Sequence, residues 1–113
     1  MEGPMSPSDG PRANDRRWRD GSEDAVIEIL REATDRSSAS DELAAHISNW
    51  PTRYHFGRAR TNLLQPLDLT DGPRVLDVGA GTGVMSRFTA ERGASVVAVE
   101  GDARRAEAAA LRC

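Results

Sequence analysis

The sequence contains one cysteine, Cys113, so it forms no disulfide within the chain and no metal site built from cysteines. Its two histidines lie nine residues apart, and without a cysteine partner they do not form a zinc site. We therefore predict that the protein binds no metal.

The sequence also lacks a long hydrophobic run. No stretch approaches the roughly 20 apolar residues that a membrane-spanning helix needs. The N-terminus lacks the continuous apolar segment of a signal peptide. Acidic residues and arginines are interspersed and the formal net charge is −3, which is not typical of a nucleic-acid-binding surface. We therefore predict a soluble, cytoplasmic protein that contacts neither membrane nor nucleic acid.

Three regions differ in composition. Residues 1–21 are rich in proline and glycine and carry few large apolar side chains, so they bury too little surface to offset the entropy of ordering. We predict a disordered tail there. Residues 22–73 have the pattern of an N-terminal helical segment, and residues 74–113 have the pattern of the start of an α/β domain.

Helical signals divide residues 22–73. Ser22 can cap a helix that begins at Glu23 and runs to about Asp35. A second short helix begins at Ser38 or Ser40 and ends before Pro51, because a proline disfavours helical geometry in the residue before it. We predict a loop for residues 50–57 and a third helix for residues 58–65.

Strand and helix signals alternate after residue 73. We predict strands at 74–78 and 95–100, a helix at 83–92, and a helix at 102–112 that Asp102 caps. Both strands are continuously apolar, which is typical of a parallel sheet that is covered on both faces. Two strands are too few for such a sheet. The fold class predicted is therefore α/β, with an incomplete Rossmann-like parallel sheet preceded by short N-terminal helices.

The run from Asp77 to Gly83 is the strongest functional signal. Its glycines lie at a junction between a strand and a helix, where a ligand can approach the backbone closely. Glu100 ends the next strand, and a carboxylate at that place can accept the hydroxyl protons of a ribose. These features predict a site for an adenosine-containing ligand.

The spacing of the glycines distinguishes between two such ligands. The dinucleotide pattern Gly-x-Gly-x-x-Gly would need a third glycine at position 84, which is Val84. The spacing present, Asp-x-Gly-x-Gly-x-Gly, resembles motif I of the class I S-adenosylmethionine-dependent methyltransferases. Glu100 stands where that family places its ribose-binding acid, and the resemblance covers residues 74–112. An NAD-binding oxidoreductase fragment is the alternative.

This resemblance implies a role for each matching residue. The glycine-rich loop would lie beneath the methionine part of S-adenosylmethionine, Asp77 would bind near its ammonium group, and Glu100 would hold the ribose hydroxyls. Gly101 would let the adenine edge approach. The loop residues are Gly79, Ala80, Gly81 and Gly83. The alternative is that Asp77 and Glu100 are polar strand ends beside a tight turn, with no ligand.

Residues 50–64 are similar to the segment that precedes motif I in large bacterial methyltransferases of polysaccharide biosynthesis. Tyr54, His55 and Arg60 would then form part of a lid over the cofactor or contact its carboxylate. The alternatives are that Tyr54 is a packing aromatic and that His55 is a hydrogen-bonded structural histidine.

These resemblances imply a methyltransferase segment that binds S-adenosylmethionine and serves an unidentified methyl acceptor, with a lean towards a saccharide. The substrate pocket and any general base would lie beyond Cys113, so we assign no catalytic residue. The chain would then be the cofactor-binding part of a longer enzyme. The alternatives are a non-catalytic remnant that binds the cofactor and one half of a split protein with a separate partner chain.

Overall fold

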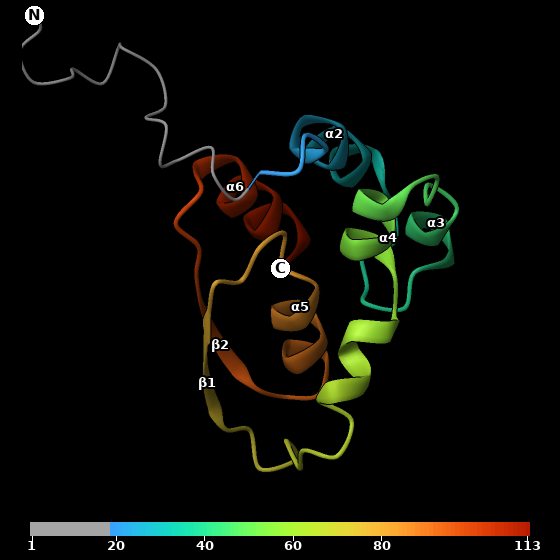
Figure 1. The fold of residues 1–113 in the computed structure, drawn as a ribbon. Helices are drawn as coiled ribbons and strands as arrows, with labels where there is room; N and C mark the ends of the chain where they lie inside the picture. The colour runs from blue at the N-terminus through green and yellow to red at the C-terminus, as the bar shows by residue number, and fades with distance from the viewer. Residues whose placement is uncertain (1–18) are drawn as a thin grey trace, which may run out of the picture.

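The computed structural model describes residues 19–113, and the first 18 residues of the predicted tail lie outside that range. The C-terminal half consists of strand β1 (Arg74–Val78), helix α5 (Val84–Glu91), strand β2 (Ser95–Val99) and helix α6 (Ala103–Arg112). The two strands pair in parallel, with Arg74 opposite Ser95 and Val78 opposite Val99. The predicted strand–helix–strand–helix order is confirmed, and Figure 1 shows both strands along one side of the molecule.

Local signals explain why these C-terminal elements matched the sequence prediction. The Asp102 carboxylate accepts a hydrogen bond from the Arg105 amide at 2.9 Å and so caps α6 as predicted. Gly93 has a φ of +105° just after α5, a backbone conformation that favours glycine and ends the helix.

The N-terminal half holds helices α2 (Glu23–Glu32), α3 (Asp41–Ala44) and α4 (Trp50–Phe56), followed by a short 3₁₀ helix, η2 (Ala59–Leu63). The loop predicted for residues 50–57 is wrong, because α4 occupies most of it. Pro51 lies in the first turn of α4, where its missing N–H costs nothing. Asn49 and Thr52 form a reciprocal capping box at that end of the helix.

The other N-terminal helices are shorter than predicted. Helix α3 starts after Ser40, whose hydroxyl accepts the Leu43 amide at 3.0 Å, and it spans only four residues. Ser22 precedes α2 but makes no side-chain cap: its backbone is helical (φ −96°, ψ −3°) rather than extended, and its hydroxyl donates to Asp20 at 2.5 Å. The predicted third helix is the 3₁₀ helix η2.

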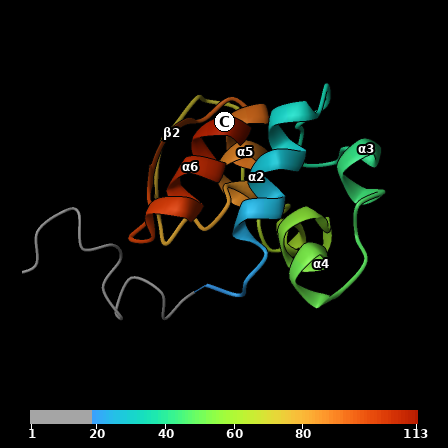
Figure 2. The same cartoon turned by 90° about the horizontal axis from the view of Figure 1, so that it is seen from above.

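The main hydrophobic core lies among the helices. Figure 2 shows α2 beside α6, with α4 and then α3 farther from the strands. The buried apolar side chains in this cluster come from α2, α3, α4 and α6: Val26, Ile27, Leu30, Leu43, Phe56 and Ala108. Burial of each large aliphatic or aromatic side chain stabilises the fold by about 1.5–3 kcal/mol. Helix α2 therefore packs against α6, and α3 and α4 contribute side chains to the same core.

The sheet is covered on one face by α5, while the other face is open within the part of the chain described. The exposed fractions are 64% for Leu76, 74% for Val78, 64% for Val97 and 49% for Val99. This open apolar face agrees with the expectation that two strands are too few for a sheet covered on both faces. None of the helices described is long and apolar enough to cross a membrane.

Candidate functional site

The glycine-rich loop between β1 and α5 has an unusual backbone. Gly79, Gly81 and Gly83 have φ angles of +73°, +62° and +95°, which residues with a side chain rarely adopt. A Cβ added at Gly79 or Gly81 would meet no atom within 4 Å, whereas one at Gly83 would lie 2.9 Å from the Ala109 Cα. The first two glycines therefore face open space, and the third allows α6 to pack closely.

Glu100 is joined to this loop directly. Its carboxylate accepts the Gly81 amide at 2.7 Å through one oxygen and the Asp102 amide at 2.9 Å through the other. The sequence placed Glu100 at a strand end beside the loop but gave no sign of this bond. The carboxylate thus joins the glycine loop to the start of α6.

A pocket of about 410 Å³ opens at this end of the strands. Three of the predicted cofactor residues, Gly79, Glu100 and Gly101, line it together with Arg105. Gly101 is exposed and a Cβ there would meet nothing within 4 Å. The structure therefore brings Gly79 to the same surface hollow as Glu100 and Gly101, which lie 21 and 22 positions later in the chain.

Asp77 is not among the residues that line this pocket. Its carboxylate accepts a hydrogen bond from the Ser86 hydroxyl at 2.7 Å, which links β1 to α5. Asp77 and Gly79 line a second pocket of about 310 Å³, which Arg60 also borders. Ala80 is buried, and its amide donates to the Val99 carbonyl at 3.0 Å. Of these three predicted cofactor residues, Asp77 and Gly79 line a pocket, whereas Ala80 bonds to the end of β2.

The three upstream candidates do not act as one group. Tyr54 stacks on Trp50 with ring centroids 5.5 Å apart, and the Arg60 guanidinium lies 4.1 Å from the Tyr54 ring centroid. Trp50, Tyr54 and Arg60 line a third hollow of about 450 Å³ beside α4. His55 instead points away from that hollow and towards the glycine loop. A contact between Tyr54 and a cofactor stays a prediction.

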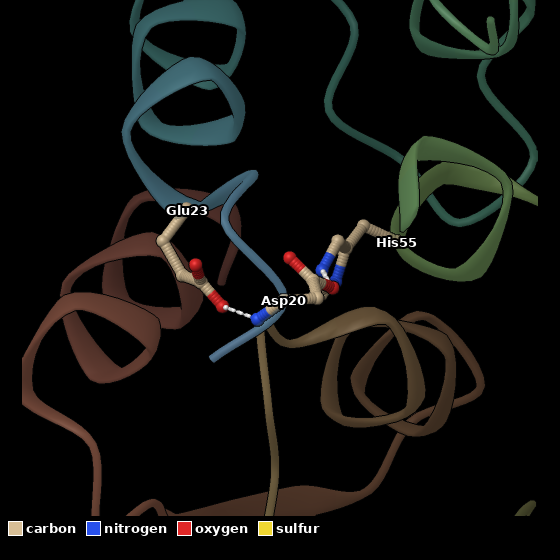
Figure 3. A group of neighbouring side chains, drawn as sticks. All are labelled: Asp20, Glu23 and His55. Atoms are coloured by element: carbon tan, nitrogen blue, oxygen red, sulfur yellow. Dashed lines mark hydrogen bonds and ion pairs between the residues drawn. The ribbon is translucent and has the colours of Figure 1, made fainter. Parts of the chain in front are cut away.

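His55 is fully buried and both of its ring nitrogens are hydrogen-bonded. Nδ1 lies 2.7 Å from the Thr82 hydroxyl in the glycine loop, and Nε2 lies 2.8 Å from the Asp20 carboxylate. Figure 3 shows Asp20 between the start of α2 and the His55 ring on α4. The structure therefore supports the interpretation of His55 as a hydrogen-bonded structural histidine.

The electrostatics of this pair follow from its burial. Desolvation lowers the pKa of His55 below its ordinary 6.5, although the Asp20 carboxylate opposes that effect. Burial alone would raise the pKa of Asp20, but hydrogen bonds from Ser22 and His55 outweigh it and lower that pKa below 3.8. At neutral pH the pair is a neutral imidazole bonded to a carboxylate.

Asp20, Glu23 and His55 place oxygen and nitrogen atoms within 4.8 Å of one another, a grouping that the sequence spacing did not suggest. Glu23 accepts the Asp20 and Gly21 amides at 3.0 and 3.1 Å. The Arg105 guanidinium lies 3.0 Å from the Glu23 carboxylate and 3.5 Å from that of Asp20. Arg105 therefore already supplies the positive charge that a cation would, and we assign this cluster to structure.

Arg112, near the end of α6, is a residue that the sequence analysis missed. Its side chain is buried, and it donates hydrogen bonds to the carbonyls of His55 at 2.7 Å, Ser37 at 3.2 Å and Arg36 at 3.3 Å. Burial lowers the pKa of Arg112 to about 10. No sequence pattern separates this arginine from exposed ones, because its partners are backbone groups of distant segments.

Comparison with known proteins gives one partial likeness. The chain is 52% identical over 46 residues to a probable protein arginine N-methyltransferase 3 from Oryza sativa subsp. indica, and equally to the one from subsp. japonica. The match covers 40% of this chain but only 7% of those relatives. No family model matches, and no solved structure matches. The likeness supports a methyltransferase, and only weakly.

Proposed function

We propose that this chain carries the cofactor-binding part of a methyltransferase that uses S-adenosylmethionine. The observation that carries the proposal is the hydrogen bond from the Gly81 amide to Glu100 at 2.7 Å, beside a pocket that Gly79 and Gly101 also line. This bond holds a carboxylate at the tip of β2 against a glycine loop, the arrangement that an adenosine-containing ligand needs. The partial likeness to an arginine N-methyltransferase supports the same class.

The residues around the pocket fit such a ligand. A carboxylate has about four lone-pair positions, and the two backbone amides use only part of that capacity. Glu100 can therefore accept ribose hydroxyls while it still holds Gly81 and Asp102. Gly79 and Gly101 line the pocket, are exposed and present no Cβ, so a ligand can lie against the backbone there.

Bound S-adenosylmethionine supplies an electrophilic methyl group on its sulfonium. In this proposal Glu100 orients the ribose, the glycine loop supports the methionine part, and Asp77 binds near the ammonium. These groups act by position, which lowers the entropic part of the barrier. No residue of this chain is assigned as a general base.

The methyl acceptor is a separate proposal. The likeness of residues 50–64 to methyltransferases of polysaccharide biosynthesis favours a saccharide, whereas the rice proteins carry arginine methylation in their name. The chain spans a small part of those relatives, and their acceptor is not transferred to it.

Titration of the chain with S-adenosylhomocysteine and, separately, with NAD tests the proposed cofactor. We expect calorimetric binding of S-adenosylhomocysteine and none of NAD. In Glu100→Gln the affinity should fall by roughly tenfold or more, since a charged hydrogen bond contributes about 1.5–3 kcal/mol. Glu28→Gln, on the exposed side of α2, serves as the matched control and should bind normally.

The opposite pattern would overturn the proposal. Binding of NAD without any response to S-adenosylhomocysteine would favour the dinucleotide alternative, despite Val84 standing where that pattern needs a glycine. Unchanged affinity in Glu100→Gln would remove the ribose role of Glu100.

A further inference from the structure

A buried chain of hydrogen bonds joins the start of the described structure to the glycine loop. Asp20 precedes α2, His55 lies on α4, and Thr82 lies between Gly81 and Gly83 in the loop. The Thr82 hydroxyl is 2.7 Å from His55 Nδ1, and the Asp20 carboxylate is 2.8 Å from His55 Nε2. His55 is fully buried and Thr82 is only 2% exposed, so water does not compete for the bond between them, while the Asp20 side chain is 13% exposed.

The direction of each bond follows from the chemistry of the groups. An ionised carboxylate only accepts, so Nε2 of His55 carries the proton that Asp20 accepts. Nδ1 of the neutral ring then accepts the proton of the Thr82 hydroxyl. This tautomer is assigned from the hydrogen-bond network. A proton added at Nδ1 would reverse the bond, because Thr82 would then have to accept.

Thr82 is the point where such an anchor has most effect. The glycines on either side of it have φ angles of +62° and +95°, and glycine has the widest backbone freedom of all residues. A loop of this kind pays a high entropic cost when a ligand orders it. A side chain fixed between two glycines removes part of that cost in advance.

We propose that His55 is a positioning residue for the cofactor site, which acts through Thr82 to hold the glycine loop in its binding shape. This inference rests on the proposed function. Asp20 in turn fixes the tautomer of His55, so the segment before α2 contributes to cofactor affinity although none of its described residues, 19–22, lines the pocket beside Glu100.

The charged groups around His55 come from three segments. Asp20 bonds the ring directly, and Glu23 on α2 lies beside Asp20. From α6, Arg105 contacts both carboxylates and Arg112 donates to the His55 carbonyl at 2.7 Å. The two arginines and two carboxylates balance one another. A proton on His55 is opposed chiefly by burial and also by the charge of Arg105, and the Asp20 carboxylate offsets only part of that opposition.

Thr82→Val and Thr82→Ser test the proposal as a matched pair, since valine keeps the shape without the hydroxyl and serine keeps the hydroxyl. We expect Thr82→Val to weaken S-adenosylhomocysteine binding about fivefold at pH 7.5, the loss of one neutral hydrogen bond. Thr82→Ser should rescue most of that loss. The exposed control Thr70→Val should bind as the wild type does. Thermal unfolding confirms that each variant is folded at the temperature of the titration.

The pH profile separates positioning from a purely structural role. In the wild type the affinity should fall as the pH is lowered from 7.5 to 5.5, and the amide signals of Gly81 and Gly83 in ¹⁵N spectra of the free chain should shift with the same midpoint. In Thr82→Val both effects should be lost. Unchanged affinity and an unchanged pH profile in Thr82→Val would overturn the proposal.

The spectra also keep the two proposals apart. If the wild type bound no S-adenosylhomocysteine, the proposed function would fail, and with it the role of His55 in binding. The amide shifts in the free chain would still decide whether His55 controls the loop. If the amide signals of Gly81 and Gly83 shift with pH but the affinity for S-adenosylhomocysteine does not change, His55 holds the loop in place without contributing to cofactor binding.

Discussion

Gly83 packs against Ala109 so closely that a Cβ on Gly83 would lie 2.9 Å from the Ala109 Cα. The start of α5 and the second half of α6 are therefore in direct backbone contact. Gly83 was identified from the sequence as part of a cofactor loop, and the structure gives it a packing role as well. The two roles lead to different expectations for neighbouring glycines.

Gly83→Ala should strongly destabilise the protein. Backbone strain at a φ of +95° costs about 1–2 kcal/mol, and the collision with α6 adds about 1–3 kcal/mol. Gly81→Ala has the strain without the collision, so it should cost only about 1–2 kcal/mol. Urea denaturation of both variants checks this. Equal losses in the two variants would show that α6 shifts freely away from the loop.

Arg112→Met should destabilise the fold through backbone groups that it leaves without partners. Its guanidinium bonds three carbonyls, and a buried carbonyl without a partner costs about 1–3 kcal/mol. We expect a loss of at least about 2 kcal/mol in the free energy of unfolding. Arg74→Met, at an exposed strand position, is the control. A loss in Arg112→Met no larger than in the control would contradict this role.

The free energy of unfolding should depend on pH below 6.5 because of His55. Burial lowers the pKa of His55, so the unfolded chain binds a proton in a window just below 6.5 that the folded chain does not bind. The contribution to stability is full above that window and is lost as the pH falls through it. Urea titrations between pH 7.5 and 5 should show this slope.

Two histidine variants identify the source of that slope. His55→Gln should remove it, whereas His46→Gln, at an exposed position just after α3, should leave it in place. A slope that persists in His55→Gln would assign it to another group.

Replacing Leu76 and Val97 by threonine should reduce self-association of the chain. These two residues are partners across the strands and each is 64% exposed on the open face of the sheet. Exposed apolar strand surface favours association. Stability should change by no more than about 0.5 kcal/mol per site, as is usual for exposed positions. Sedimentation velocity measures the association, and Val26→Thr in the core is the destabilising control.

Local sequence signals predicted the C-terminal half better than the N-terminal half. Strand β1 matches its predicted bounds, and Asp102 caps α6 as expected. By contrast, the sequence pattern predicts that Pro51 ends one helix, whereas it lies in the first turn of another. A proline interrupts a helix or begins one depending on the capping residues before it, and the Asn49–Thr52 capping box decided the matter here.

The sequence by itself determined the α/β order, the glycine-rich turn and the position of Glu100 at a strand end, because these depend on backbone preferences and spacing within a few residues. Only the tertiary structure decided which groups meet. The bonds of Glu100 to Gly81, of His55 to Asp20 and Thr82, and of Arg112 to backbone carbonyls join segments that lie 19 to 76 residues apart. Such pairs form when the packing of α2 and α4 on α6 brings polar groups together in a buried place, where each must find a partner.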